Sequence, residues 1–600
     1  MRIGVDAGGT FTDFVALHDD GRVETFKLRS NPKNPAKVIL EGLRRVGSAD
    51  VVHGSTVATN ALLERKGVRT AFVTTKGFED ILEIGRQNRP ELYNLTPSPR
   101  ALLVPRELCF GVGERAHHDG AIALRPSAAE LARLAARLKR SGAKAIAICF
   151  LHSYRNATNE RAVAKALQRE GIYVCASHEI TPEFREYERA STTAVNAYVG
   201  PLMDAYLSEL AEARGFRISI MQSNGGFLSA RDAAKHAART VLSGPAGGVI
   251  GAMRVAQASG FKRVLGFDMG GTSTDVSLID GAPRETTEAS IDGLPVRVPM
   301  LDIHTVGAGG GSIARIDAGG LLRVGPESAG ADPGPACYGK GTLPTVTDAH
   351  VVLGHIASLL GGAMPIDAER AAKAIDSIAK PLKLTREAAA HGIIRVANAN
   401  MERAIRVVSV ERGYDPRDFA LLAFGGCGGL HACDIARELG MKTVIVPRHA
   451  GVLSALGMLL ADAVRDYSAG VLGRADLEAE FAKLERRALR ESPGAVMERS
   501  ADVRYVGQSF ELNVAWPVGR RFHREHARTY GYARPDRETE VVTIRVRAKL
   551  KTPRVRLAGE QVTKPRQGPA LLADYGSTTL IPAGWRYHRD RVGNIVIQAS

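Results

Sequence analysis

The sequence is poor in cysteine and has no long apolar run, and each shortage excludes a class of protein. Six cysteines among 600 residues are too few for a disulfide framework, so we expect a reducing, cytoplasmic setting. No stretch approaches the roughly 18 uninterrupted apolar residues that indicate a transmembrane helix. The chain also opens directly on a strand pattern, which argues against a signal peptide. We therefore expect no membrane partner.

Acidic residues are outnumbered by basic ones, 64 to 80, which gives a formal net charge of +16. An excess of this sign can indicate a nucleic-acid partner. The arginines are scattered, however, and no basic run carries interleaved aromatic side chains. We therefore expect a basic surface and no nucleic acid.

Glycine is in surplus, with 63 residues among 600, and it is clustered. The opening segment RIGVDAGGTFTDFVAL, residues 2–17, has a counterpart in VLGFDMGGTSTDVSLI, residues 264–279. Both segments contain an apolar strand, a Gly-Gly-Thr turn and a second apolar strand. The repeat predicts two β-hairpins with glycine-rich tips.

Such tips are suited to phosphate. Glycine lets the backbone approach an anion closely and point its N–H groups at it, and the threonine hydroxyl adds a further donor. Two copies favour two halves that hold one nucleotide from both sides of a cleft, although each tip could simply be a tight turn. The expected nucleotide-binding residues are Gly8, Gly9, Thr10, Thr12, Gly270, Gly271, Thr272 and Thr274.

An aspartate precedes each tip and another follows it. A carboxylate repels phosphate unless a hydrated Mg²⁺ lies between them. We expect Asp6 and Asp268 to hold Mg²⁺ through water. Asp13 and Asp275 are expected either to hold its waters as well or to act as a base in a transfer reaction.

Two further glycine clusters stand in the second half of the sequence. A buried strand ends in Gly425, Gly426, Gly428 and Gly429, and such a turn lets a base or ribose lie against bare backbone. The 307–311 loop, with Gly309 and Gly310, could hold substrate or another phosphate. The alternative for this loop is a flexible segment without ligand contacts.

Strand patterns alternate with helix patterns along most of the chain, which indicates the α/β class. Examples are a strand over 70–75, a helix over 127–141, a helix over 243–258 and a strand over 420–424. After about residue 475 the segments alternate in the manner of strands. We expect one half over 1–200, a second over 201–470 and a smaller β-rich C-terminal domain over 475–600.

Long motifs carry a resemblance to a known family. They include VHGSTVATNALL at 52–63, EIGRQNRP at 83–90, MQSNGG at 221–226, DIHTVGAGGG at 302–311 and VERG at 410–413. With these motifs the chain is identified as a member of the hydantoinase A and 5-oxoprolinase family. The resemblance implies two ATPase halves of the actin, Hsp70 and sugar-kinase type around a nucleotide cleft. Where the family usually reads GGAGPLH, this chain has GGCGGLH at 425–431, which still fits a base-binding turn.

The substrate side of the site is less well marked. Arginine offers a planar fork that matches oxyanions, although a structural ion pair is at least as good an explanation for any single one. Asp302 and His304 alternate on one strand, so they face the same way and could bind a second divalent metal. The candidates for substrate or phosphate are Arg86, Asn88, Arg89, Arg185, Arg189, Asn224, Gly309 and Gly310, and of these Arg86 and Arg189 are also expected to be catalytic. The candidates for the second metal are Asp302, His304, Asp332 and Asp348.

The resemblance implies an ATP- and Mg²⁺-dependent hydrolase of a cyclic amide such as hydantoin, N-methylhydantoin or 5-oxoproline. It also implies a hydantoinase B-like partner subunit and both homo- and hetero-oligomers. Two alternatives stay open at this point. One is an ATP-dependent carboxylase of the acetone or acetophenone type, and the other is an actin-like ATPase that uses nucleotide as a switch.

Overall fold

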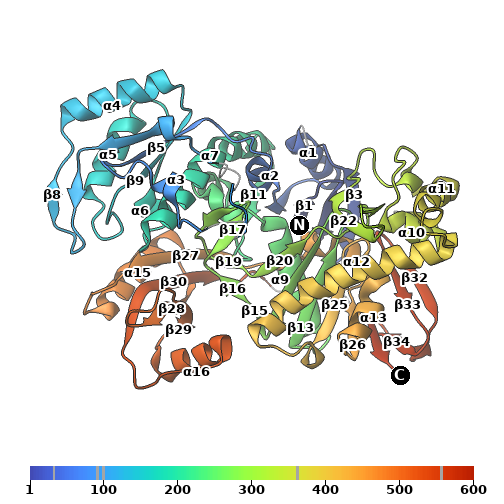
Figure 1. The fold of residues 1–600 in the computed structure, drawn as a ribbon. Helices are drawn as coiled ribbons and strands as arrows, with labels where there is room; N and C mark the ends of the chain where they lie inside the picture. Colours follow the sequence, from blue (N-terminus) through green and yellow to red (C-terminus); the bar gives the residue numbers. More distant parts are fainter. Residues whose placement is uncertain (32–33, 89–92, 97–101, 360–361, 363, 554–558) are drawn as a thin grey trace.

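The computed structural model of the chain describes residues 1–600 except 32–33, 89–92, 97–101, 360–361, 363 and 554–558. Its fold is mixed α/β, with two large sheets and a smaller one (Figure 1). In the described residues, no helix combines the length and the apolarity that a membrane crossing requires.

The first large sheet has ten strands drawn from distant parts of the chain. In it β1 pairs antiparallel with β2 and parallel with β4, so the predicted first hairpin forms and is anchored in a sheet. The strands, in spatial order, are β29 (Leu512–Ala515), β28 (Val496–Tyr505), β30 (Thr539–Leu550), β27 (Ala463–Gly470), β12 (Phe227–Ser229), β11 (Phe216–Met221), β4 (Ala49–Gly54), β1 (Arg2–Ala7), β2 (Phe11–Leu17) and β3 (Val23–Arg29).

The second large sheet contains the second hairpin, β13 and β14, in the same antiparallel pairing as the first. It has nine strands, and β20 (Ile303–Val306) lies beside β14 off the main path. The others, in spatial order, are β15 (Ala282–Pro283), β14 (Thr274–Asp280), β13 (Arg263–Met269), β25 (Ala420–Phe424), β26 (Thr443–Val446), β35 (Ile595–Ala599), β34 (Trp585–Arg589) and β31 (Arg566–Gln567).

The segment 475–600 is therefore not a separate β-rich domain. Its first strands, β28 to β30, extend the first sheet beyond β27, and its last strands, β34 and β35, extend the second sheet beyond β26. The prediction of a third domain was wrong because strand patterns show that strands form but not which sheet edge they join. Figure 1 shows the segment divided between the two sides of the molecule.

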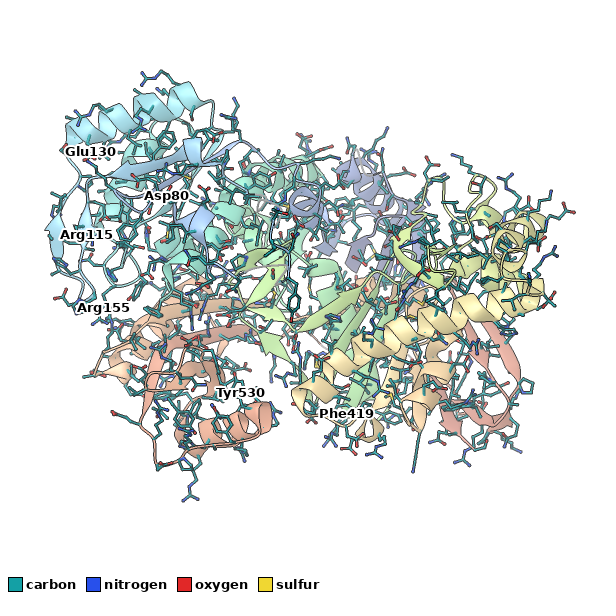
Figure 2. The ribbon with its side chains drawn as sticks, in the orientation of Figure 1. Asp80, Arg115, Glu130, Arg155, Phe419 and Tyr530 are labelled. Carbon is teal, nitrogen blue, oxygen red and sulfur yellow. The ribbon has the colours of Figure 1, made fainter. Side chains whose placement is uncertain are left out.

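A four-stranded sheet and the helices α4 and α5 form an outer lobe (Figure 1). Glu130 and Asp80, which are labelled in Figure 2, lie in this lobe. Its strands, in spatial order, are β10 (Tyr173–Ala176), β9 (Ala145–Cys149), β5 (Thr70–Thr75) and β6 (Cys109–Val112). The helices are α1 (Pro35–Val46), α2 (Val57–Leu63), α3 (Ile81–Ile84), α4 (Ala128–Ser141), α5 (Thr158–Gln168), α6 (Ser177–Ile180), α7 (Glu186–Ala211), α8 (Ala230–Lys235), α9 (Ser243–Ala258), α10 (Val346–Val352), α11 (Ala368–Ala379), α12 (Arg386–Val408), α13 (Gly428–Glu438), α14 (Leu453–Leu460), α15 (Leu477–Glu491) and α16 (Gly519–Tyr530).

Two helices cross between the large sheets with almost no side chain between their backbones. A Cβ on Gly457 of α14 would lie 1.9 Å from the carbonyl oxygen of Gly247 in α9. Most residues of both helices are buried, among them Leu456, Met458 and Val249. Glycine at this crossing fixes the spacing of the two helices.

We expect Gly457→Ala to destabilise the fold by about 3 kcal/mol, because the methyl group forces the helices apart. Gly392→Ala is the matched control, since the added Cβ in α12 meets only ordinary contacts at 3.4 Å and favours the helix. Denaturant unfolding followed by circular dichroism measures both. Equal stabilities of the two variants would contradict the close-packed crossing.

Candidate active site

A cavity of about 540 Å³ lies between the tips of the two hairpins. The first hairpin contributes Gly8, Gly9 and Thr10 to its wall, and the second contributes the segment 270–272. The turn at Gly425 and Gly426 forms another part of the wall. The structure thus places three of the predicted glycine clusters, far apart in sequence, around one space.

The backbone around this cavity is arranged for an anion. Gly8 and Gly270 close the two tips by donating to the carbonyls of Phe11 and Ser273. Among the described residues, the next amides, those of Gly9 and Gly271, have no backbone acceptor. The first residues of α9 and α14 also line the cavity, so the positive ends of two helix dipoles face it.

Two pairs of carboxylates lie at the base of the tips. Asp6 is directly opposite Asp13 in the first hairpin, and Asp268 is directly opposite Asp275 in the second. All four side chains line the cavity. The four predicted acidic residues are therefore brought together by the structure.

Burial raises the pKa of each of these four carboxyl groups and so disfavours ionisation of all of them together. Burial and the charge of Asp13 raise the pKa of Asp6 to about 7, and burial raises the pKa of Asp275 to about 6. Burial and the neighbouring Asp275 and Asp6 carboxylates raise the pKa of Asp268 well above its ordinary value. A cation among these groups would relieve the repulsion and restore their charged forms.

The donor set suits a polyphosphate accompanied by a hydrated divalent cation. Carboxylates and water are the ligands that Mg²⁺ prefers, and it usually keeps several of its waters. Across the described residues, no three His, Cys, Asp or Glu side chains are close enough to bind one metal ion directly. The contact through water expected for Asp6 and Asp268 stays a prediction.

Sequence reasoning missed several residues of the cavity. Lys27 of β3 donates to both carboxylate oxygens of Asp13 at 2.8 Å and to the Gly451 carbonyl at 2.6 Å. The turn at 573–578, between β32 (Ala570–Asp574) and β33 (Ser577–Ile581), also lines the cavity. A lone lysine carries no motif, and this turn had been assigned to a separate domain, so neither was recognisable.

Some predicted nucleotide ligands lie behind the cavity wall instead. The hydroxyl of Thr12 is 3.0 Å from that of Ser30, and the hydroxyl of Thr274 donates to the Ala308 carbonyl. Both side chains are fully buried and brace the hairpins from within. The predictions for Thr12 and Thr274 were wrong because strand alternation points them away from the tip.

Four predicted glycines also support the wall rather than form it. Gly310 donates its N–H to the carbonyl of Gly270, and Gly309, equally buried, packs against Thr272. Gly428 and Gly429 begin α13, and a Cβ on Gly429 would lie 2.7 Å from the Thr578 carbonyl. Close backbone packing, not ligand contact, explains glycine at these positions.

The arginines proposed for catalysis or phosphate lie outside the cavity. Arg86 forms a two-point ion pair with Glu188, with distances of 2.8 and 2.7 Å. Arg189 is completely buried and donates to the carbonyls of Glu183 and Phe150. We withdraw both as catalytic candidates, because their guanidinium groups are engaged by the protein itself.

The remaining substrate candidates that the structure describes do not line the cavity either. Arg185 binds both carboxylate oxygens of Glu511 at 3.0 Å. The amide group of Asn224 is held by Asp466 at 2.6 Å and by the Gly226 N–H. Asn88 is exposed, and Arg89 lies outside the described residues.

The predicted second metal site is not formed. Asp302 is paired with Arg284 and Arg412, and Asp332 contacts Lys340 on the surface. Asp348 is buried, where it caps α10 and accepts from the amides of residues 336, 337 and 345. Among the described residues, these four side chains form no group that could hold a metal ion. Sequence proximity had suggested a cluster that the fold separates.

A row of histidines packs behind the third glycine turn. His355 is linked to His350 through ring nitrogens 3.0 Å apart, and His350 to His431 at 3.1 Å. His431 in turn contacts Asn398 at 2.6 Å. Burial lowers the pKa of His431 to about 3 and that of His350 well below its ordinary value. The row therefore depends on neutral imidazoles.

We expect the protein to lose stability as the pH falls below about 6.5, the pKa of unfolded histidine. Each buried histidine has a lower pKa in the folded protein than in the unfolded chain, so the folded state is favoured fully above pH 6.5. As the pH falls from 6.5 towards the folded pKa, the free energy of unfolding decreases by about 1.4 kcal/mol per pH unit for each histidine. Thermal unfolding between pH 8 and 5 measures the slope. His350→Gln should flatten it, whereas exposed His118→Gln should not; identical slopes would contradict the assignment.

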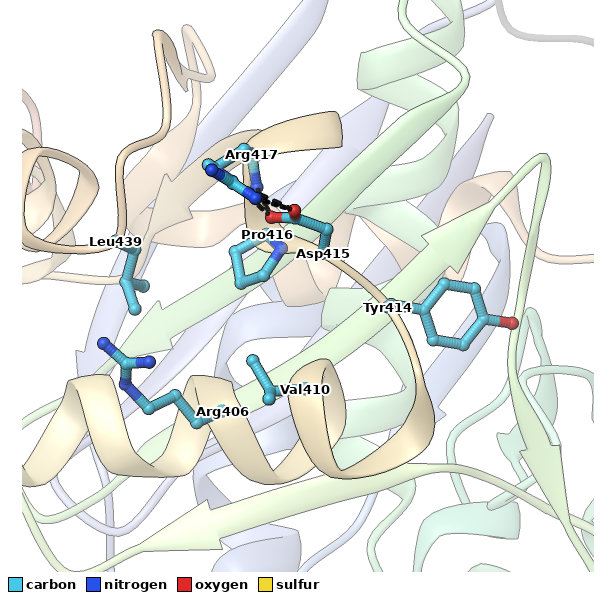
Figure 3. Close-up of a pocket in the computed structure, with 7 residues that line it drawn as sticks. All are labelled: Arg406, Val410, Tyr414, Asp415, Pro416, Arg417 and Leu439. Carbon is cyan, nitrogen blue, oxygen red and sulfur yellow. Dashed lines mark hydrogen bonds and ion pairs between the residues drawn. The ribbon is translucent and has the colours of Figure 1, made fainter. Parts of the chain in front are cut away.

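A second, open depression of about 390 Å³ lies at the end of α12 (Figure 3). Arg417 folds back onto Asp415 there, with contacts of 2.6 to 3.0 Å. Arg406, Tyr414 and Leu439 complete the lining. The depression contains none of the glycine tips or paired carboxylates of the central cavity, which remains the candidate site.

Comparison with known proteins gives the class to which this chain belongs. The model of the hydantoinase/oxoprolinase N-terminal region matches residues 2–171, and the hydantoinase/oxoprolinase model matches residues 189–467. The chain belongs to the hydantoinase/oxoprolinase family.

Three relatives make the similarity specific. Caprolactamase subunit alpha of Pseudomonas jessenii is 37% identical over 98% of this chain and 90% of its own length. The crystal structure of the ATP-dependent caprolactamase from that organism matches all of both chains with a TM-score of 0.88 and 33% identity. 5-oxoprolinase 1 of Arabidopsis thaliana is 35% identical over 91% of this chain, and the match covers only 50% of the length of that oxoprolinase. The nucleotide-free structure of acetone carboxylase has a TM-score of 0.81 at 26% identity, covering 100% of this chain and 99% of that one.

Proposed function

We propose that this chain is the ATP-binding subunit of an ATP-dependent hydrolase that opens a cyclic amide. The observation that carries the proposal is the pair of duplicated hairpins that meet across one cavity with four carboxylates between them. Names of relatives support the substrate class, since two of them are a caprolactamase subunit and a 5-oxoprolinase. We assign the two large sheets to two ATPase halves of the actin, Hsp70 and sugar-kinase type.

An unstrained amide needs activation because its carbonyl is a poor electrophile and its nitrogen a poor leaving group. Bound ATP would supply a phosphoryl group for the amide oxygen, and Mg²⁺ would offset the charge of the phosphates. The amides of Gly9 and Gly271, which have no backbone acceptor among the described residues, would donate to phosphate oxygens. Asp6 and Asp268 would hold the metal-bound waters, and the turn at Gly425 and Gly426 would accept the base or ribose. Catalysis by such a site is mostly positioning and neutralisation of charge.

A partner subunit is part of the proposal. The chain spans half of the Arabidopsis 5-oxoprolinase, and the Pseudomonas relative is described as a subunit. We infer that a hydantoinase B-like partner completes the hydrolysis after activation of the amide. An ATP-dependent carboxylase remains the alternative, because the acetone carboxylase structure matches the chain over its whole length.

The test is ATP hydrolysis by the chain purified together with its partner. We expect 5-oxoproline, a hydantoin or caprolactam to raise phosphate release at least tenfold over the rate with ATP alone. Acetone or acetophenone with bicarbonate is the comparison. Stimulation by the ketone and bicarbonate, with none by any cyclic amide, would contradict the hydrolase proposal and favour the carboxylase alternative.

A further inference from the structure

The two hairpins repeat the same pair of aspartates but differ in the strand beside them. In the first sheet, β3 places Lys27 directly opposite Asp13. In the second sheet, β20 places Thr305 directly opposite Asp275. The same position of the repeated unit therefore carries a cationic side chain on one side of the cavity and a neutral one on the other.

Lys27 is fully engaged. Its side chain is only 9% exposed, and its ammonium group contacts Asp13 Oδ1, Asp13 Oδ2 and the Gly451 carbonyl within 2.8 Å. An ammonium group has three protons, so these contacts use all of them. Gly451 lies in the turn before α14, and the lysine thus fixes the first hairpin against the opposite wall of the cavity.

Thr305 gives Asp275 a hydrogen bond but no charge. Its hydroxyl donates to Asp275 Oδ1 at 2.5 Å. The side chains that act most strongly on Asp268 are Asp275, Asp6, Ser454 and Asp13, and none of them is a cation. When all four carboxylates are ionised, the first pair with Lys27 carries one net negative charge and the second pair carries two.

We propose that the two hairpins are functionally unequal: Lys27 is a built-in cation for the first pair and confines a divalent metal ion to the second pair, Asp268 and Asp275. A dipositive ion is attracted most where two negative charges are uncompensated. The lysine is a positioning residue that acts through Asp13. This inference rests on the proposed nucleotide site and narrows its metal position from Asp6 and Asp268 to Asp268 and Asp275. It does not depend on the identity of the amide substrate.

Direct metal binding tests the assignment without substrate or nucleotide. Mn²⁺ favours the same carboxylate and water ligands as Mg²⁺, and electron paramagnetic resonance counts the free ion. We expect the wild-type chain to bind one Mn²⁺. Thr305→Lys should weaken that binding at least tenfold, because the new ammonium group would neutralise Asp275. Thr305→Ser keeps the hydroxyl and should bind as the wild type does.

The reciprocal change is Lys27→Met, which should raise the number of bound Mn²⁺ ions from one to two. Lys27→Arg should keep the number at one, and Lys66→Met, on the surface, is the matched control. If Lys27→Met does not fold, the Thr305→Lys result decides alone. A wild type that binds no Mn²⁺, or Mn²⁺ affinity unchanged in Thr305→Lys, would overturn the inference, whereas loss of the proposed function would appear separately as a lack of amide-stimulated ATP hydrolysis.

Discussion

Asp268→Asn is expected to lower amide-coupled ATP hydrolysis by about 10²–10³-fold or more, the range seen when a charge-stabilising group is removed from an active site. The amide has the shape of the carboxylate but cannot hold metal-bound water with the same charge. Asp6→Asn should also lower turnover, because Asp6 lines the same cavity and its charge acts on Asp268, but the loss should be smaller because the metal ion is confined to the second pair. Phosphate release with a saturating cyclic amide measures the effect.

The fold of the Asp268→Asn variant should survive and even gain stability. Asp268 is held among the Asp275 and Asp6 carboxylates, which raise its pKa together with burial. Removing its charge relieves that repulsion, so the melting temperature in the absence of nucleotide should not fall. Asp204→Asn, on the exposed face of α7, is the control and should retain full turnover. Wild-type turnover in Asp268→Asn would reject the paired-hairpin site.

Glu183→Gln is expected to cost about 3–5 kcal/mol of stability, the usual result of breaking a buried ion pair. Glu183 accepts two hydrogen bonds from Arg545 and one from Arg297, each at 2.8 Å. All three side chains are buried. The neutral amide leaves Arg545 with Asp502 and Arg297 with the half-exposed Glu288, so the buried part of the network loses one of its two carboxylate charges.

Denaturant unfolding followed by circular dichroism measures this loss, and Glu64→Gln is the control because its ion pair with Lys66 is exposed. Burial alone would raise the pKa of Glu183, but the positive charges of Arg545 and Arg297 lower it to about 2. Its contribution is therefore present above the unfolded pKa of about 4.3 and is lost as the pH falls towards 2. A variant as stable as the control at pH 7 would contradict the buried network.

The network also explains why sequence reasoning divided the chain in the wrong place. Glu183 precedes α7, Arg297 follows β18 (Leu294–Val296), and Arg545 belongs to β30. An arginine in a strand pattern reads as a solvent-facing residue, and nothing local shows that its partner is Glu183, 362 positions away. The last part of the chain is joined to the first sheet by contacts of this kind.

Local structure, in contrast, was largely predictable. The strand expected over 70–75 is β5, the helix expected over 243–258 is α9, and the strand expected over 420–424 is β25. Both hairpins form where the repeat placed them. Hydrophobic periodicity and glycine turns act within a few residues, so they can be read from one sequence.

The candidate site was most predictable where the motif was duplicated. Asp6, Asp13, Asp268 and Asp275 meet as expected because a repeat of the same hairpin implies the same geometry. Arg86 and Arg189 belong to equally distinctive motifs, yet they serve ion pairing and backbone binding. Motif specificity identifies the family, whereas the role of one side chain depends on what the fold places beside it.

The strand order of the ten-stranded sheet determines how early the sheet can be completed while the chain is being synthesised. β12 emerges near residue 229, but β27, which covers its free edge, begins only at Ala463. At translation rates of about 5–20 residues per second, this edge stays unpaired for about ten to fifty seconds. β30 must then insert between β27 and β28 before the sheet is complete. An N-terminal fragment that ends before β27 would therefore carry a permanently open, aggregation-prone edge.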